Sequence, residues 1–256
     1  MTSGEALSLA GRVALVTGAS RGLGRAIALA FGAAGATVAC AARSRDQVED
    51  TAARVREAGG QARAFPLDVT RGEQIVTAVA AVTQALGPID ILVNNAGMVI
   101  EKKTVEMTDE DWDGILSTNL TSMFRCCRAV APSMIERRRG KIVNIGSMWG
   151  RLGVSRHTAY CVSKAGVDAL TRCLAVEWAR HGIRVNCVAP GYIRTDFQTE
   201  VMADERIRSL IHSKIPLRRL GDPGEVGALV VYLASPAAEF MTGQTIYLDG
   251  GQTIAY

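Results

Sequence analysis

The feature that most restricts the fold of this chain is a regular alternation of short apolar runs with longer helical patterns. The apolar runs lie at residues 13–16, 36–41, 62–65, 91–93, 142–145, 185–188 and 245–248. Helical spacing fills segments between them, such as 23–31, 75–85, 116–135 and 162–178. Strands that alternate with helices build a parallel sheet covered on both faces, which also explains runs that are apolar throughout. We therefore expect an α/β fold with a doubly wound, parallel sheet of seven strands.

No linker, change of composition or internal repeat divides the 256 residues. A chain of this length suits one large α/β domain, so we expect a single domain over residues 1–256 with a core at about 9–251. The weakest pattern lies at residues 196–216, which are polar and lack a strand-like run. We expect either a mobile lid over a site or an ordinary helical excursion there.

The composition excludes several other classes of protein. Hydrophobic residues make up 48% and charged residues 21%, which is typical of a globular chain rather than a disordered one. The net charge is +4 and the charges are mixed along the chain, so we expect no nucleic-acid partner. The one compact basic run, at residues 137–139, falls where a helix should end and is interpreted as a solvated helix terminus.

The location of the protein is also constrained. No apolar run approaches the roughly 18 residues of a membrane span, and the first residues lack the pattern of a signal peptide. The six cysteines and three histidines form neither a CxxC pair nor a cluster, so we expect no metal site and no disulfide framework. The cysteines are interpreted as small buried apolar residues in a reducing compartment, and a soluble cytoplasmic protein is expected.

A glycine-rich sequence follows the first apolar run and precedes a helical pattern. In the spacing Gly-x-x-x-Gly-x-Gly, it contains Gly18, Ser20, Arg21, Gly22, Leu23 and Gly24. Glycines at a strand-to-helix turn let the backbone approach a pyrophosphate closely, and the helix N-terminus attracts its charge. A glycine-rich loop alone is weak evidence, but at this place in an α/β chain it indicates a dinucleotide site.

The end of the second strand, near Ala42, distinguishes the two nicotinamide cofactors. A site for NAD usually carries an acidic residue there, which binds the ribose 2′-hydroxyl. This chain has Arg43 instead, and Arg21 lies within the glycine-rich loop. A carboxylate repels a 2′-phosphate, whereas a guanidinium offers it a planar pair of donors. We therefore expect NADP(H) in preference to NAD(H); the alternative is that Arg43 only caps the strand.

Further short motifs follow in order along the chain. They are LDV at 67–69, NNAG at 94–97, Asn119, Ser147, YxxxK at 160–164, Pro190 with Gly191, Thr195, and DGG at 249–251. Together with the glycine-rich loop, they resemble the short-chain dehydrogenase/reductase family over about residues 9–251, without departure at the catalytic positions. The resemblance implies a Rossmann-type fold and an NAD(P)-dependent oxidoreductase that acts on CH–OH groups.

The resemblance also implies roles for individual residues. Asp68 and Val69 would contact the adenine. The floor beneath the cofactor riboses would be lined by Asn95, Ala96 and Gly97. The nicotinamide end would be held by Ile193 and Thr195, next to Pro190 and Gly191. The cofactor would also be contacted by Tyr160 and Lys164. Asn119 would hold a water that links Lys164 to solvent as a proton relay.

The expected chemistry depends on Tyr160 and Lys164, which are four residues apart and so share one face of a helix. A phenol has a pKa of about 10. A nearby ammonium and an oxidised nicotinamide should lower that pKa, which makes Tyr160 the expected general acid/base. Ser147 should hydrogen-bond the substrate oxygen where charge develops. A catalytically idle, nucleotide-binding regulator would be expected to lack some of these residues, so that class is disfavoured.

Substrate contacts are expected from residues 100–103, 148–156, Tyr192 and 196–216. These segments mix apolar residues with basic ones that could meet an anionic group, namely Lys102, Lys103, Arg151, Arg156 and the neighbouring His157. His157 is interpreted as a pocket or surface residue rather than a catalytic one. The mixture leaves the substrate open.

Two subfamilies are most similar to the chain. Resemblance to the 3-oxoacyl-carrier-protein reductases implies a thioester carbonyl as substrate and an acidic acyl carrier protein that docks on Arg138 and at His181. Resemblance to the gluconate 5-dehydrogenase type implies a sugar acid, although those enzymes usually carry a basic doublet where this chain has Ile100 and Glu101. Reduction of another small-molecule ketone stays open.

The resemblance finally implies a homotetramer. Helices at 116–135 and 162–178 would pack against their copies across a two-fold axis, and the last strand with residues 251–256 would form a second interface. Met123, Phe124 and Leu174 are expected to be exposed on those helices, where they would be a liability in a monomer.

Overall fold

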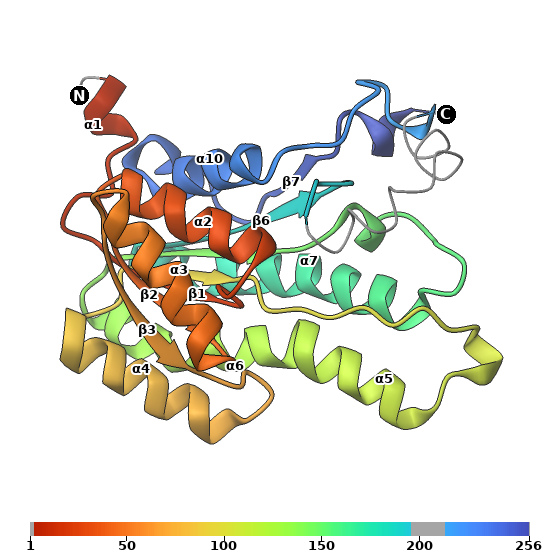
Figure 1. Ribbon diagram of the computed structural model, residues 1–256, viewed down its shortest axis with the longest axis horizontal. Helices are drawn as coiled ribbons and strands as arrows, with labels where there is room; N and C mark the ends of the chain where they lie inside the picture. Colours follow the sequence, from red (N-terminus) through yellow and green to blue (C-terminus); the bar gives the residue numbers. More distant parts are fainter. Residues whose placement is uncertain (1–2, 196–212, 256) are drawn as a thin grey trace.

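A computed structural model describes residues 3–195 and 213–255 (Figure 1). The strands of these residues form one parallel, seven-stranded sheet in the order β3-β2-β1-β4-β5-β6-β7. They are β1 (Val13–Thr17), β2 (Thr37–Ala42), β3 (Gln61–Pro66), β4 (Ile91–Asn94), β5 (Gly140–Ile145), β6 (Ile183–Pro190) and β7 (Thr245–Leu248). Each coincides with an expected apolar run, so the doubly wound α/β prediction is confirmed.

Helices connect the strands and cover both faces of the sheet (Figure 1). The α-helices are α1 (Ser3–Ala6), α2 (Gly22–Ala33), α3 (Arg45–Glu57), α4 (Gly72–Leu86), α5 (Asp109–Leu116), α6 (Ser122–Glu136), α7 (Thr158–Trp178) and α10 (Pro223–Ala234). The short 3-10 turns are η1 (Thr104–Glu106), η3 (Met148–Gly150), η4 (Ala179–His181), η5 (Pro236–Ala238) and η6 (Gln252–Ile254). A π-helical turn, η2 (Ser117–Thr121), joins α5 to α6, so the helix expected at 116–135 is not uniform.

Two apolar cores lie on opposite faces of the sheet because successive strand side chains point to opposite sides. Ala14 and Val16 of β1 face the core made with α2, α3 and α10. Val13 and Leu15 of the same strand face the core made with α4, α6 and α7. Strands covered on both faces are therefore mostly apolar, with polar residues such as Lys141 and Asn186 as exceptions. The edge strand β3 departs from this pattern, since part of it is exposed.

The strand order reverses between β1 and β4, which are neighbours in the sheet. From β1 the chain winds outward through β2 to β3, and then it returns to β4 and continues through β5 and β6 to β7. In open parallel sheets a crevice opens at the carboxyl ends of the strands where this reversal occurs. The topology therefore places the carboxyl ends of β1 and β4 beside the expected dinucleotide site.

The basic run at residues 137–139 is more than a solvated helix end. Arg137 and Arg139 bind Oδ1 of the buried Asp90 at 2.7 and 2.6 Å. Asp90 Oδ2 accepts a hydrogen bond from the Val13 backbone at the start of β1. The cations thus join the end of α6 to the amino ends of β1 and β4. The run lies at the end of α6 as expected and Arg139 is more than half exposed, but both arginines also pair with a distant carboxylate, which the interpretation did not include.

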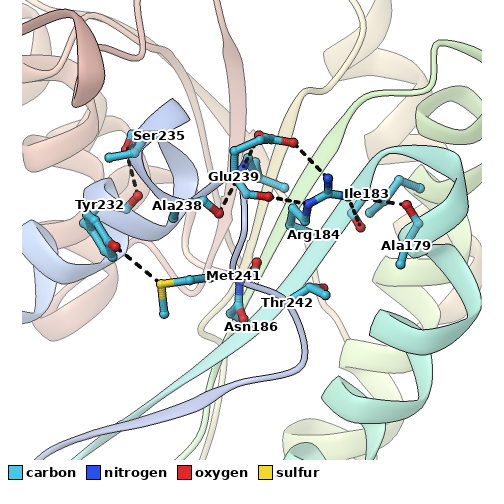
Figure 2. A network of polar contacts seen from close by, with 12 residues as sticks. Ala179, Ile183, Arg184, Asn186, Tyr232, Ser235, Ala238, Glu239, Met241 and Thr242 are labelled. Atoms are coloured by element: carbon cyan, nitrogen blue, oxygen red, sulfur yellow. Dashed lines mark hydrogen bonds and ion pairs between the residues drawn. The ribbon is translucent and has the colours of Figure 1, made fainter. Parts of the chain in front are cut away.

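A second polar network fastens the connection between α10 and β7 to the sheet (Figure 2). Arg184, near the start of β6, binds the Glu239 carboxylate at 3.1 Å and donates to its backbone oxygen at 2.7 Å. Asn186 donates to the Met241 carbonyl oxygen. Lys141 of β5 holds the other oxygen of the Glu239 carboxylate at 2.9 Å. The amino edge of the sheet is therefore held by polar contacts, and the carboxyl edge is left for the site.

All six cysteines are free thiols. Four of them are buried as expected, but Cys161 is half-buried and Cys173 is exposed on α7. Among residues 3–195 and 213–255, no helix has both the length and the apolar character to cross a membrane. The segment expected as a lid or helical excursion lies outside the described residues, apart from 213–216.

Candidate active site

Two adjoining cavities lie at the carboxyl edge of the sheet. The larger, of about 720 Å³, runs from the glycine-rich loop past the ends of β2 and β3. The smaller, of about 260 Å³, lies over the ends of β5 and β6 and reaches Ser147, Tyr160 and Lys164. Leu23 and Asn95 border both cavities. A long ligand in the larger cavity can therefore extend one end toward the tyrosine.

Two glycines of the glycine-rich loop are packed too tightly for a side chain. Gly18 has a φ of +65°, and a Cβ there would lie 2.8 Å from the Ala96 Cα. A Cβ on Gly24 would lie 2.1 Å from the Gly18 oxygen, so this glycine serves the packing of the turn and lines neither cavity. Asn95 Nδ2 donates to the backbone oxygens of Thr17 and Gly18 at 3.1 Å each. The asparagine thus holds the loop in place.

The N-terminus of α2 is suited to an anion. Its N-cap residue, Arg21, makes no side-chain capping hydrogen bond, so the first-turn N–H groups are not taken by a side-chain cap. Arg21 and Arg43 both line the larger cavity. Within the described part of the chain, neither guanidinium has a carboxylate at ion-pair distance. The cavity, the N–H groups and the two cations fit a dinucleotide with an additional phosphate.

The far end of the larger cavity is formed by the loop after β3. Asp68, Val69 and Thr70 line it. Asp68 Oδ1 accepts from the Thr70 hydroxyl at 2.7 Å and from its backbone N–H at 3.0 Å. Burial acts to raise the pKa of Asp68, but the bonds from Thr70 and the charge of Arg43 together hold it below its usual range. The carboxylate stays ionised and keeps the loop folded.

Asn119 is fully buried in the π-helical turn and borders neither cavity. Its Oδ1 accepts from the Met98 N–H at 2.8 Å, and its Nδ2 donates to the Met98 oxygen and to Ser163 Oγ. A Cβ on Gly97 would lie 3.4 Å from Asn119 Oδ1 and 3.8 Å from Lys164 Nζ. The side chains of Asn119, from η2, and Lys164, from α7, therefore both lie close to Gly97.

Ser147 and Tyr160 meet at the smaller cavity. Ser147 follows β5 and caps η3, where its Oγ accepts from the Trp149 N–H at 3.2 Å. Burial raises the pKa of Tyr160, and a hydrogen bond with Ser147 lowers it by less. The direction is opposite to the one expected from a neighbouring ammonium, because the sequence does not show the loss of solvent around the phenol.

Lys164 lies on α7 one turn after Tyr160 and is buried. Its Nζ donates to the Ile145 oxygen at 2.8 Å and lies 5.7 Å from the centre of the Tyr160 ring. Burial lowers the pKa of the ammonium to about 8. At neutral pH the lysine thus keeps most of its charge close to the phenol.

An aromatic cluster adjoins the tyrosine. The Trp149 ring meets the rings of His157, Tyr160 and Tyr192 edge-on, with centroids 4.7, 5.8 and 6.2 Å away. His157 Nδ1 is 2.8 Å from the Ser155 oxygen. This agrees with the interpretation of His157 as a pocket or surface residue. Through these ring contacts, Trp149 connects Tyr160 of α7 to Tyr192 in the segment after β6.

The basic residues expected to meet an anionic substrate are paired with groups of the protein. Arg156 binds Glu101 at 2.7 Å, and Lys102 binds Asp111 at 2.5 Å. Lys103 binds Glu106 at 3.1 Å, and Arg151 lies over the Tyr247 ring at 5.5 Å. The acids are Glu101, Glu106 and Asp111, and the sequence did not predict that they pair with these cations.

The structure brings nearly all expected site residues to one edge of the sheet. Those that line a cavity are Gly18, Ser20, Arg21, Gly22, Leu23, Arg43, Asp68, Val69, Asn95, Ala96, Gly97, Ser147, Tyr160, Lys164, Pro190, Gly191, Ile193 and Thr195. Sequence reasoning missed Ser44, Gln47, Thr70 and Thr118, which also line the larger cavity. Ser44 and Gln47 follow Arg43 at the start of a helix, and that position was their only signal.

The helices expected at a subunit interface present other residues than predicted. Met123 and Leu174 are buried in the cores, so their expected exposure is wrong. Phe124 is exposed as expected, with Arg128 5.2 Å above its ring. Val162 and Val176 are exposed on α7. The helical period places Met123 and Leu174 on the inner faces of α6 and α7.

Comparisons with known proteins agree with this geometry. The model of a family described as enoyl-(acyl carrier protein) reductase matches residues 18–253. The 3-oxoacyl-(acyl-carrier-protein) reductase FabG of Vibrio harveyi is 43% identical over 246 residues, 96% of this chain and 98% of the relative.

Solved structures are similar over nearly the whole chain as well. A short-chain type dehydrogenase/reductase from Mycobacterium marinum has a TM-score of 0.93 and 40% identity, covering 98% of this chain and 99% of that one. A gluconate 5-dehydrogenase from Burkholderia cenocepacia, in complex with NADP and tartrate, has a TM-score of 0.95 and 34% identity, covering 100% of both chains.

Proposed function

The chain belongs to the short-chain dehydrogenase/reductase family and is an oxidoreductase that interconverts a carbonyl and an alcohol. We propose that it reduces the 3-oxo group of an acyl thioester with NADPH. The observation that carries the proposal is the meeting of Ser147, Tyr160 and Lys164 at a cavity that adjoins the larger, dinucleotide-sized one. When bound, the nicotinamide supplies the hydride in reduction and accepts it in oxidation.

The protein's own groups handle the substrate oxygen. The Ser147 hydroxyl accepts a bond from the Trp149 N–H and hydrogen-bonds the Tyr160 phenol; when substrate is bound, its O–H can turn to donate to the substrate oxygen, where negative charge develops. Tyr160 donates its phenolic proton to the same oxygen. The Lys164 ammonium stabilises the phenolate that remains, and a proton returns through the lysine and a water at Asn119.

We propose NADP(H) in preference to NAD(H). Arg21 and Arg43 border the cavity beside Ser44 and Gln47, so two cations and two neutral donors surround the place of a 2′-phosphate. Asp68, the one acid among the described residues that line the cavities, is held by Thr70. In Arg43→Ala the KM for NADPH should rise about tenfold or more, since bonds to charged groups contribute about 1.5–3 kcal/mol, while the KM for NADH changes little.

The paired cations favour a neutral group next to the carbonyl. Arg156, Lys102 and Lys103 each have a carboxylate partner, so none of these three binds a substrate carboxylate without losing an ion pair. Arg151 lies over the Tyr247 ring instead. A thioester is uncharged at this position, whereas a sugar acid is not. The sugar-acid alternative is kept because of the similarity to the gluconate 5-dehydrogenase.

An acyl carrier protein is the proposed partner. Arg138 donates to the Arg180 oxygen, and Arg180 Nε lies 3.2 Å from His181 Nε2, so three basic side chains gather at the ends of α6 and η4. This patch lies at the amino edge of the sheet, away from Tyr160. If α6 and α7 pair with their copies in antiparallel fashion, the patch of one subunit comes beside the site of its partner. The six free thiols, four of them buried, support the proposal of a reducing, cytoplasmic location.

The test is NADPH oxidation by the purified protein with an acetoacetyl thioester and a 5-keto sugar acid side by side, and with NADH in parallel. Fast turnover of the thioester is expected. Turnover of the sugar acid alone would replace this proposal by the sugar-acid alternative. Arg138→Glu should raise the KM for the carrier-bound thioester and leave that for a free pantetheine thioester unchanged.

A further inference from the structure

One end of the larger cavity is lined by residues 67–70, the loop after β3, and this loop is hydrogen-bonded to α6. Arg125 of α6 donates from a guanidinium N–H to the Thr70 backbone oxygen at 2.8 Å. The contact joins residues 55 positions apart, and it is partly buried. The Arg125 stem also passes the start of α4, where a Cβ on Gly72 would lie 3.8 Å from the Arg125 Cδ. No other side chain of α6 hydrogen-bonds this loop among the described residues.

The hydrogen bonds made by residues 68–70 themselves are short-range, apart from the one that Arg125 donates. The Thr70 hydroxyl and N–H both bind Asp68 Oδ1, and the Asp68 N–H donates to Gln74 Oε1 at 2.9 Å. These bonds shape the turn. The Leu67 N–H also binds the Ala42 oxygen at the end of β2, and Leu67 and Val69 are buried in the core, but none of these contacts is a hydrogen bond to α6. Arg125 adds a bond to a different element, the helix that continues from the π-helical turn and Thr118. Thr118 and Thr70 line the same cavity, so the bond also sets the distance between two of its walls.

We infer that Arg125 is a positioning residue for the adenine half of the cofactor, an inference that rests on the proposed use of NADPH. Arg125 is absent from the residues that line either cavity, so it acts through the Thr70 carbonyl rather than on the ligand. By holding residues 68–70 against α6, it keeps Asp68 and Val69 in place for the adenine before the cofactor arrives. Such preorganisation lowers the ordering cost of binding.

The test compares Arg125→Met, Arg125→Lys and the control Arg128→Met. Methionine keeps much of the stem and removes the donor, while lysine restores one donor. Arg128 is exposed on the same helix, lies over Phe124 and does not contact the loop. Binding of NADPH is followed by its fluorescence, and binding of adenosine 2′,5′-bisphosphate, which has only the adenine half, by competition. Mass and thermal unfolding are recorded for each variant.

In Arg125→Met the Kd for NADPH and the Ki for the bisphosphate should both rise about fivefold to tenfold, since a hydrogen bond from a charged donor is lost. The kcat at saturating NADPH should stay within about twofold, because Tyr160 and Lys164 are held by other elements. Arg125→Lys should recover part of the affinity, and Arg128→Met should match the wild type. Loss of kcat without loss of bisphosphate affinity would indicate a general structural role and overturn the inference.

Two other outcomes separate the inference from the proposed function. If the wild type binds NADPH and Arg125→Met binds both ligands equally well, the inference fails and the proposed function stands. If the wild type binds neither NADPH nor the bisphosphate, the proposed function fails and the inference falls with it. If Arg125→Met does not fold, the same comparison is made with Arg125→Lys. The Kd for NADPH and the Ki for the bisphosphate must then rise above the wild-type values, by less than the fivefold to tenfold expected for Arg125→Met.

Discussion

Burial acts on the two reacting side chains in the same sense, toward their neutral forms. It raises the pKa of the Tyr160 phenol and lowers that of the Lys164 ammonium to about 8. A phenol that holds its proton is a competent donor to a substrate oxygen, and a charged lysine beside it stabilises the phenolate after transfer. Charge alone predicts a lowered tyrosine pKa; desolvation of the phenol, which only the fold creates, reverses the direction.

Tyr160→Phe tests the role of the phenol. The variant keeps the ring, so the edge-on contact with Trp149 and the fold should persist. The kcat should fall about a thousandfold, within the range that general acid–base catalysis contributes, and the Kd for NADPH should change little. Steady-state kinetics and cofactor fluorescence measure both. Tyr232→Phe, remote on α10, is the control, and wild-type turnover by Tyr160→Phe would exclude the mechanism.

The pKa of Lys164 predicts a pH-dependent stability. In the unfolded chain a lysine has a pKa of about 10.4, and burial lowers it to about 8 in the folded protein. Between these values the unfolded state binds more protons, so stability rises with pH. The cost of the buried charge is therefore fully present below pH 8 and is relieved toward pH 10.4.

In Lys164→Met this cost is absent at every pH. The Tm of the wild type, relative to that of Lys164→Met, should therefore increase as the pH rises from about 8 to 10.4. Thermal unfolding across this range measures the difference. Lys103→Met, which removes an exposed ammonium, is the matched control, and a constant difference for Lys164→Met would contradict the assignment.

At the scale of elements, sequence patterns located the strands but not what joins them at their ends. The alternation of apolar runs marks β1 to β7, and Thr108 with Asp111 forms a capping box that starts α5. The π-helical turn carries no comparable signal. The turn contains Asn119, which hydrogen-bonds Met98 and Ser163. The π-helical turn therefore coincides with hydrogen bonds between residues far apart in the chain rather than with a local sequence preference.

Asp90→Asn tests the joint between α6 and the sheet. Asp90 is buried and binds Arg137, Arg139 and the Val13 N–H. Removing its charge leaves partly buried guanidinium groups without their partner, and the free energy of unfolding should fall by about 3 kcal/mol. Urea denaturation measures the loss. Glu49→Gln, in an exposed pair with Arg56, should cost no more than about 0.5 kcal/mol, and equal losses would refute the distinction.

For the whole molecule, the outer faces of α6 and α7 carry apolar side chains that a monomer would leave in water. Phe124 is 42% exposed, Val162 44% and Val176 82%. These faces are the proposed two-fold interface of a homotetramer, and the edge strand β7 with residues 251–256 is the proposed second one. Exposed apolar residues on adjoining helices favour association.

Phe124→Glu tests this assembly. The wild type should have the mass of a tetramer by light scattering, and the buried charge in the variant should reduce the mass to that of a smaller species. Val76→Glu is the control, because Val76 is 64% exposed on α4, outside the proposed interfaces. A monomeric wild type, or an unchanged mass for Phe124→Glu, would refute the interface.

The sequence by itself determined the doubly wound sheet, the glycine-rich turn, and the order of Ser147, Tyr160 and Lys164 along the chain. These depend on periodicity, backbone freedom and short spacings, which are local properties. The tertiary structure decided which cations meet carboxylates, which apolar residues of α6 and α7 face solvent, how Arg125 reaches Thr70, and how burial shifts the phenol. The contacts join residues far apart in the chain, as between Arg156 and Glu101 or between Arg125 and Thr70, and the shift of the phenol pKa comes from the solvent that folding removes. The inner and outer faces of α6 and α7 also follow a local pattern, the helical period.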